Sequence, residues 1–159
     1  MAWKYYQKLI LIFNLSFALF ALESFIKYYL ILNKVPMQGF YLFLKIIQII
    51  FIPNQNIAFN LPLPQFLIIV IVIVILILLA LIWWQSLIIG NLTQILALSL
   101  IMLGALSNLV DRLLFGYVID YINLFIWPVF NLADVMIVAG VIIYILSEFK
   151  KPKVKTLTI

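Results

Sequence analysis

The sequence predicts an all-α integral membrane protein with four transmembrane helices and a small extracytoplasmic β or interfacial insert between the first two. Hydrophobic residues make up 68% of the 159-residue chain and charged residues only 9%, whereas a soluble domain is roughly half apolar and about a quarter charged. Several apolar runs are also long enough to cross a hydrocarbon core of roughly 30 Å as a helix. We expect a single membrane domain over residues 1–159.

The first predicted span covers residues 9–32. It follows Lys4 and Lys8, as the apolar core of a signal peptide would, but no small-residue cleavage site interrupts the run. We therefore expect a retained first helix.

The predicted outer insert covers residues 33–65. Its apolar stretch, residues 40–52, is too short to span a membrane and is bracketed by Gly39 and Pro53. A small sheet, or an interfacial segment lying on the outer leaflet, fits this stretch best. The amides at positions 54–56 need hydrogen-bond partners in such apolar surroundings.

The second and third spans are predicted over residues 66–84 and 87–109. Only Gln85 and Ser86 separate them, so they should form an antiparallel hairpin. The fourth span is predicted over residues 129–146.

Four spans place both termini on the same side of the membrane. Lys4 and Lys8 precede the first span, and a basic tail at residues 147–159 follows the last. By the positive-inside rule both termini are cytoplasmic, and the segments at residues 33–65 and 111–128 face outward. The net charge of +5 thus reflects juxtamembrane lysines that set the topology and favour anionic lipid, and we expect no nucleic acid partner.

The residue inventory limits the possible chemistry. The chain contains no cysteine and no histidine, which removes thiolate catalysis, the usual general base and the commonest metal ligand. Any reaction must use carboxylates, lysines, hydroxyls or amides, and we expect neither a metal nor a cofactor.

The acidic residues are concentrated at one depth. With the predicted topology, Glu23, Asp111, Asp120 and Asp134 all lie near the outer edge of the hydrocarbon, whereas Glu148 is a solvated end charge on the cytoplasmic side. Ionisable residues inside spans are expensive and indicate function by default.

Several of these acids also have simple structural interpretations. Glu23 and Lys27 have the i, i+4 spacing of an ordinary helical ion pair. Asn131 and Asp134 have the pattern of a helix N-cap followed by an acid in the first turn. Asp111, in contrast, lies at a helix C-terminus, where an acid opposes the helix dipole.

Asp120 has no such structural explanation, because it lies between apolar residues in an extended-looking, β-branched stretch after Gly116. The loop from Asp120 to Asp134 contains Pro128 and has room to double back, so the two carboxylates could face each other. Two carboxylates that share a site do not both ionise readily, so one holds a proton while the other acts as a base. Such a pair activates water without a metal, a histidine or a covalent intermediate.

The chain resembles the bacterial lipoprotein signal peptidases (signal peptidase II) in two stretches, GALSNLVDRLLFGYVIDYI and FNLADV. Members of that family are four-span membrane aspartic proteases that cleave before a lipid-modified cysteine. The resemblance implies that Asp120 and Asp134 are catalytic. It also implies a supporting or substrate-binding set formed by Glu23, Lys27, Asn54, Asn108, Asp111, Arg112 and Asn131.

Four positions depart from the pattern of that family. Glu23 stands at an aspartate position, Asn56 and Ser107 stand where glycine is usual, and Tyr121 replaces a phenylalanine. These departures concern substrate fit and inhibitor binding more than the chemistry.

The sequence thus predicts an intramembrane aspartic endopeptidase of the bacterial cytoplasmic membrane, with its active site near the extracytoplasmic face. The expected partners are lipid-modified prolipoproteins and membrane lipid, and we expect a monomer. Two alternatives remain open. The protein could be a small proton or ion carrier that uses the same acids, or a non-catalytic relative of the family that binds lipoproteins.

Overall fold

The computed structural model describes residues 2–33, 39–42, 46–55 and 63–149. Asn56 and the basic tail from residue 150 onward lie outside the described residues.

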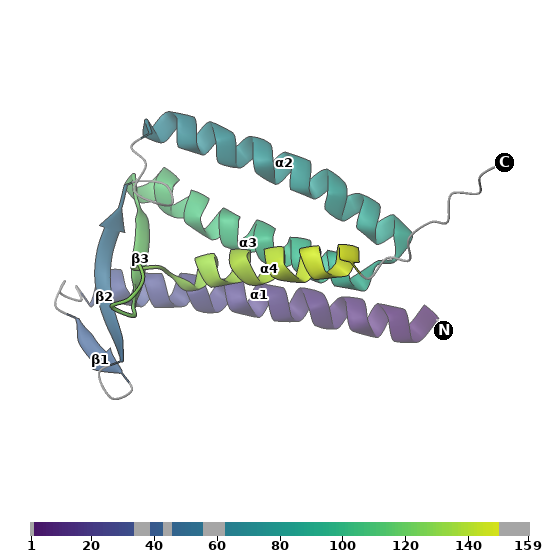
Figure 1. Ribbon diagram of the computed structural model, residues 1–159, viewed down its shortest axis with the longest axis horizontal. Coiled ribbons are helices and arrows are strands. Elements are labelled where there is room, and N and C mark those ends of the chain that lie inside the picture. The colour runs from purple at the N-terminus through teal and green to yellow at the C-terminus, as the bar shows by residue number, and fades with distance from the viewer. Residues whose placement is uncertain (1, 34–38, 43–45, 56–62, 150–159) are drawn as a thin grey trace.

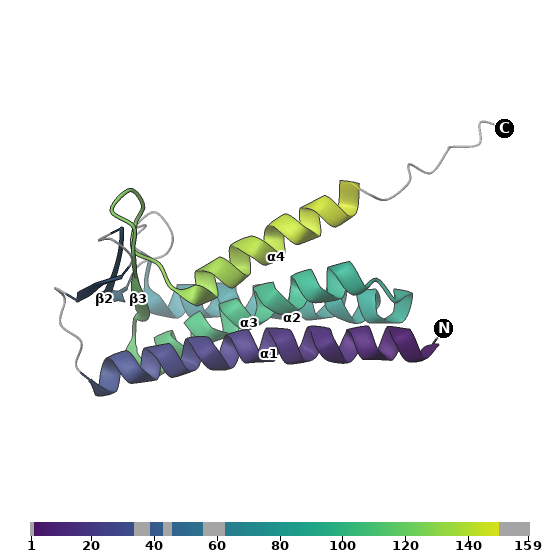
Figure 2. The same ribbon diagram turned by 90° about the horizontal axis from the view of Figure 1, so that it is seen from below.

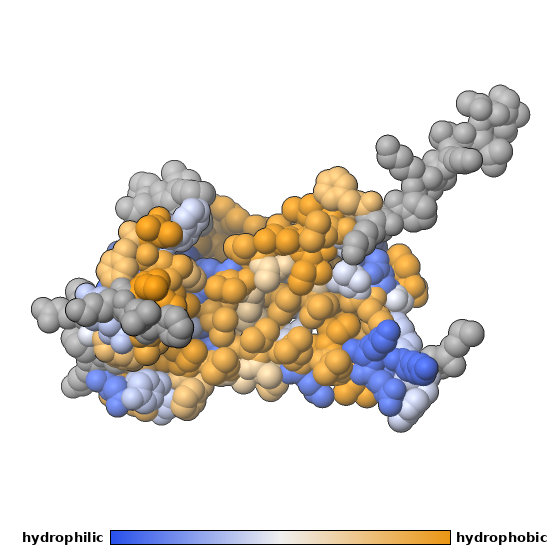
Figure 3. Space-filling model, turned by 60° about the horizontal axis from the view of Figure 1, so that its bottom comes forward, coloured by the Kyte–Doolittle hydropathy of each residue, from blue (hydrophilic) through white to orange (hydrophobic). Residues whose placement is uncertain are grey.

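Four helices form the body of the protein: α1 (Ala2–Leu32), α2 (Gln65–Ile89), α3 (Leu92–Phe115) and α4 (Leu132–Phe149) (Figure 1). All four are long and apolar enough to cross a membrane. Hydrophobic residues cover most of the surface along the bundle, and hydrophilic ones gather near the end where α1 begins (Figure 3). The predicted four-helix membrane fold is confirmed.

The turn between α2 and α3 lies about one helical turn later than predicted. We expected it at Gln85 and Ser86, but α2 continues through both and ends before Gly90. Gly90 has a φ of 77°, a left-handed conformation that glycine adopts without a Cβ clash. Asn91 then caps α3, because its side chain accepts a hydrogen bond from the backbone N–H of Gln94 at 3.2 Å. The two helix caps, rather than the two polar side chains, determine where the chain turns.

The other helix ends also differ from the predicted spans, because a helix continues beyond the hydrocarbon core. Helix α1 begins at Ala2, and α4 runs from Leu132 to Phe149. Helix α3 extends to Phe115 and is capped by Gly116, whose φ is 79°. Asp111 therefore lies inside the last turns of α3 and not in the loop after it.

Helix α3 is the centre of the bundle and packs against the three other helices. Buried residues make up 56% of its most apolar stretch, against 6% for α2, which faces lipid over most of its surface. Two glycines allow α3 and α4 to approach closely. A Cβ at Gly104 would lie 2.5 Å from the carbonyl oxygen of Ala133, and one at Gly140 would lie 2.6 Å from that of Ala97. Small residues at such contacts are the usual basis of helix packing in membranes.

A three-stranded antiparallel sheet lies across one end of the bundle, away from the end where α1 begins (Figures 1 and 2). Its strands β1 (Phe40–Leu42) and β2 (Ile47–Asn54) come from the insert, which confirms the predicted small sheet. The third strand, β3 (Val118–Asn123), comes from the segment between α3 and α4 and pairs with β2. This long-range pairing brings the end of the insert next to the beginning of α4.

Candidate active site

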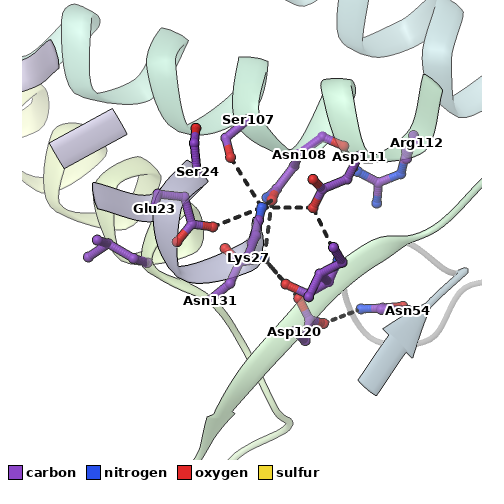
Figure 4. Close-up of polar contacts among 12 residues, drawn as sticks. Glu23, Ser24, Lys27, Asn54, Ser107, Asn108, Asp111, Arg112, Asp120 and Asn131 are labelled. Atoms are coloured by element: carbon purple, nitrogen blue, oxygen red, sulfur yellow. Dashed lines mark hydrogen bonds and ion pairs between the residues drawn. The ribbon is translucent and has the colours of Figure 1, made fainter. Parts of the chain in front are cut away.

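Strand β3 carries Asp120 into the junction between the sheet and the helices. In the register of β2 with β3, Asn54 pairs with Val118 and Ile52 pairs with Asp120, so Asn54 and Asp120 are diagonal neighbours on one face. The Asn54 amide donates a hydrogen bond of 2.7 Å to Oδ2 of Asp120 (Figure 4). The segment before α4 closes the other side, because Nδ2 of Asn131 donates to Oδ1 of Asp120 at 2.8 Å.

Asp120 is only 3% exposed. The pKa of its carboxyl group is raised from 3.8 to about 6, mainly by burial and also by the negative charge of Asp134. The hydrogen bonds from Asn54 and Asn131 and the charge of Lys27 oppose this rise. Asp120 therefore retains a proton closer to neutral pH than an ordinary aspartate does.

Asp134 lies in the first turn of α4 and is half-buried. Its backbone N–H donates to Oδ1 of Asn131 at 2.9 Å, and its own Oδ2 accepts from the backbone N–H of Asn131 at 3.2 Å. This reciprocal pair is a capping box, so the predicted helix-cap interpretation is confirmed. The cap leaves Oδ1 of Asp134 to accept a hydrogen bond of 2.9 Å from the Asn108 amide. Both oxygens of the Asp134 carboxyl group therefore accept hydrogen bonds, which fixes its orientation at the start of α4.

Two asparagines connect the two aspartates. Nδ2 of Asn131 contacts both Oδ1 of Asp120 and, at 3.1 Å, Oδ1 of Asn108. Nδ2 of Asn108 donates to Asp134. The carboxyl groups thus lie at the two ends of a continuous chain of hydrogen bonds, which fixes both of them relative to α3 and α4.

A buried lysine occupies the centre of the cluster (Figure 4). Lys27 is 4% exposed, and its Nζ lies 2.8 Å from Oε1 of Glu23 and 2.8 Å from Oδ2 of Asp111. It also donates to Ser107 Oγ at 3.1 Å and Asn108 Oδ1 at 3.2 Å. A buried ammonium group needs this many partners to offset its loss of hydration.

The position of Asp111 near a helix C-terminus now has a structural reason. Its Oδ2 binds Lys27 and also accepts a hydrogen bond of 3.1 Å from the backbone N–H of Ile119, next to Asp120 in β3. Asp111 therefore attaches the strand to the end of α3. Arg112 points its guanidinium back along the helix, where one NH₂ group donates to the carbonyl oxygen of Asn108 at 3.3 Å.

All the residues predicted for the site lie in this one region. They are Glu23 and Lys27 from α1, Asn54 from β2, Asn108, Asp111 and Arg112 from α3, Asp120 from β3, and Asn131 and Asp134 at the start of α4.

Sequence reasoning missed two contributors, Ser107 and Tyr121, which it treated only as departures from a pattern. Ser107 accepts from Lys27, and its spacing of four residues from Asp111 on α3 could have placed it on the same face. Tyr121 donates a hydrogen bond to Glu23 from a buried position. A hydroxyl group in an otherwise apolar strand beside Asp120 was the available signal.

A family model described as Signal peptidase (SPase) II matches residues 15–150. Two relatives bear the name lipoprotein signal peptidase. The relative from Moorella thermoacetica is 67% identical over 48 residues, which are 30% of this chain and 32% of that protein. The relative from Halothermothrix orenii is 52% identical over 59 residues, 37% of this chain and 41% of that protein. The matched segments thus span less than half of either relative.

Two solved structures are similar over nearly the whole chain. One is a bacterial membrane enzyme determined by the in meso method at 2.3 Å resolution, with a TM-score of 0.79 and 28% identity over 94% of this chain and 92% of that one. The other, a bacterial membrane enzyme at 1.9 Å, has a TM-score of 0.75 and 28% identity over 90% of this chain and 93% of that one.

Proposed function

The chain belongs to the signal peptidase II family, and we propose that it is an intramembrane aspartic endopeptidase that removes signal peptides from lipid-modified prolipoproteins. The observation that carries this proposal is the pair Asp120 and Asp134, joined through Asn131 and Asn108 at the end of a membrane bundle. The names of the relatives support the choice of substrate, which is a chain cut before its diacylglyceryl cysteine.

The two aspartates have different roles in the mechanism that we propose. Asp120 holds the shared proton in the resting enzyme, which its pKa of about 6 supports. Asp134 is the base, and both of its oxygens accept hydrogen bonds from Asn108 and Asn131. Asp134 takes a proton from water, the resulting hydroxide adds to the scissile carbonyl carbon, and the proton on Asp120 passes to the carbonyl oxygen.

The second half of the reaction reverses these roles. Asp134 returns its proton to the amine nitrogen as the C–N bond breaks, and Asp120 recovers a proton from the tetrahedral intermediate as the new carboxyl group forms. The products are the signal peptide with a free carboxyl end and the lipoprotein with a free amino group. Both aspartates return to their starting protonation states.

The supporting side chains hold the carboxyl groups in place. In the free protein the amides of Asn54, Asn108 and Asn131 all bind the aspartates. We propose that they orient these groups and that Asn54, at the end of β2, also contacts the substrate backbone. Lys27 and Asp111 brace the site and do not react.

We further propose that both termini are cytoplasmic and that the site faces the extracytoplasmic side of the bacterial cytoplasmic membrane. Lys4 and Lys8 are exposed at the start of α1, at the opposite end of the bundle from the sheet. Their position favours a cytoplasmic start of α1 by the positive-inside rule. The protein would act as a monomer within the lipid, with the acyl chains of the substrate against the bilayer.

The hydrogen bonds of Gln94 count against a proton carrier. Asn91, Thr93 and Gln94 are polar residues that could have extended a proton path toward the cytoplasm, and Gln94 lies about 20 Å along the helix from Asn108. It instead binds Ser86 and Glu148, which ties together the far ends of α2, α3 and α4. Glu148 is exposed, as expected, but it also accepts this hydrogen bond.

The direct test uses purified protein in lipid with a synthetic prolipoprotein, with and without the diacylglyceryl group on its cysteine. We expect release of the signal peptide from the lipid-modified form alone, measured by mass spectrometry of both products. Binding of that substrate without any release would instead identify a non-catalytic relative. Proton uptake by vesicles that contain the protein, without cleavage, would identify a carrier.

A further inference from the structure

The hydroxyl group of Tyr121 links helix α1 to the start of helix α4. Tyr121 is 2% exposed and lies on β3 next to Asp120. Its hydroxyl donates a hydrogen bond to Oε2 of Glu23 on α1 and accepts one of 3.2 Å from the backbone N–H of Leu132. Leu132 is the first residue of α4, two positions before Asp134.

The contact with Leu132 fixes the first turn of α4. The first N–H groups of a helix have no partner within the helix and must find one elsewhere. In α4, the side chain of Asn131 accepts from the N–H of Asp134, and the Tyr121 hydroxyl accepts from the N–H of Leu132. The tyrosine therefore constrains the position of the turn that carries Asp134. Burial, together with the charge of Glu23, raises the pKa of the Tyr121 hydroxyl, so it remains a neutral donor.

The other end of the link depends on the length of the Glu23 side chain. Glu23 is fully buried, with Oε1 at 2.8 Å from Lys27 and Oε2 at the Tyr121 hydroxyl. An aspartate at this position would carry its carboxyl group closer to α1 by one C–C bond, roughly 1.5 Å. That shift exceeds the tolerance of a hydrogen bond, so the shorter acid could bind Lys27 or the tyrosine but not both in the present geometry.

We propose that Glu23 and Tyr121 act as a single positioning pair, which ties α1 to the first turn of α4 and thereby holds Asp134 in its place beside Asp120. The inference rests on the proposed aspartic peptidase function. The structure brings these two residues, which are 98 positions apart in the chain, into direct contact. Glu23 joins the pair to Lys27 on α1, and Tyr121 joins it to the backbone of Leu132 at the start of α4, so the link between the two helices needs both residues.

A double-mutant cycle of Glu23→Asp, Tyr121→Phe and the combined variant tests this pair. Each single change leaves a buried polar group without its partner, so kcat should fall about three- to tenfold while KM changes less than twofold. In the combined variant the shorter acid can bind Lys27 and no tyrosine hydroxyl is left without its acceptor, so this variant should be no slower than the slower single variant. Glu148→Asp and Tyr117→Phe are matched changes outside the cluster and should leave kcat unchanged. The ring of Tyr117 packs against Phe51 and Phe115.

A second measurement is independent of catalysis. Hydrogen exchange at the Leu132 amide should be at least tenfold faster in Tyr121→Phe than in the unmutated protein, and unchanged in Tyr117→Phe. If the unmutated protein does not cleave, the proposed function fails while this exchange result still tests the pair. If the losses of kcat in the two single variants multiply in the combined variant, or if exchange at Leu132 is unchanged, the proposed positioning pair is wrong even in an active enzyme.

Discussion

Lys27 shows how this membrane protein maintains charged groups in a buried cluster. Its ammonium group lies between the carboxylates of Glu23 and Asp111 and reaches two further oxygens. One lysine between two carboxylates leaves these three side chains with a net negative charge. The positively charged Arg112 follows Asp111 directly in α3. Because each acid has its own second partner, Tyr121 for Glu23 and Ile119 for Asp111, the charges also fix the geometry of β3.

The hydrogen bond from Asn54 should set the pH range in which Asp120 keeps its proton. This bond favours the ionised carboxylate and lowers the pKa of Asp120. Its loss in Asn54→Leu should raise that pKa, so the protonated, active form persists to higher pH. A hydrogen bond to a charged group contributes about 1.5–3 kcal/mol, so the alkaline limb of kcat/KM should move upward by roughly one to two pH units.

The pH profile of kcat/KM for Asn54→Leu, compared with that of Gln48→Leu, measures this effect. Gln48 lies on the same strand and accepts a hydrogen bond from Asn123, away from the carboxyl groups. Its variant should keep the original alkaline limb. A downward shift in Asn54→Leu, or an equal shift in both variants, would show that Asn54 does not control the proton on Asp120.

At the scale of the elements, the site depends on the close approach of α3 and α4. Gly104 faces the carbonyl oxygen of Ala133, the residue before Asp134, and Gly140 faces Ala97 further along the same pair of helices. An added methyl group at either position must push the helices apart, at a cost of about 1–3 kcal/mol.

The two glycines allow stability and activity to be separated. Gly104→Ala and Gly140→Ala should lower the thermal unfolding temperature by similar amounts. Only Gly104→Ala displaces the turn that carries Asp134, so its kcat should fall roughly 10- to 100-fold, whereas Gly140→Ala should lose less than threefold. Equal losses of kcat in the two variants would mean that the helix contact matters for stability alone.

The elements also mark what the sequence could and could not predict. Hydropathy locates four spans because each must cross the same thickness of hydrocarbon. The α2–α3 turn was misplaced because Gly90 and Asn91 end and restart the helices, whereas Ser86 satisfies its hydroxyl on its own helix. Pairing of β2 with β3 joins segments more than sixty residues apart in the chain, and no local pattern in either strand specifies its partner.

The residues of the site were easier to predict than the contacts between them. Asp120 could be recognised because a carboxyl group in an apolar strand requires an explanation. The hydrogen bond between Tyr121 and Leu132 could not be predicted from the sequence, because it depends on where the start of α4 lies relative to β3. Hydropathy reports depth in the membrane, but it does not report which side chains at that depth touch.

At the scale of the whole molecule, the bundle has one charged, solvent-facing end and one end that holds the site. Exposed Lys4 lies near the start of α1, and exposed Gln55 follows β2 at the sheet. The chain has no natural cysteine, so single cysteines can be introduced without a background. An impermeant thiol reagent applied to intact cells should label Gln55→Cys and leave Lys4→Cys unlabelled until the cells are opened. Labelling of Lys4→Cys alone in intact cells would show that the protein has the opposite orientation in the membrane.

The pairing of Asp120 with Asp134 is the central claim, and cleavage by the Asp-to-Asn variants tests it most directly. Asparagine keeps the shape of the side chain but does not act as a base, so Asp120→Asn and Asp134→Asn should each lower cleavage of the lipid-modified prolipoprotein by roughly a thousandfold or more. Both variants should still insert and bind the substrate. The double variant should be no slower than either single one, because the two groups serve the same step.

Glu148→Gln provides the matched control, because it removes an acid from the opposite end of the bundle and should cleave at the normal rate. The expected result is that both single variants are folded but inactive and that the control is fully active. Cleavage at a near-normal rate by either Asp120→Asn or Asp134→Asn would contradict it.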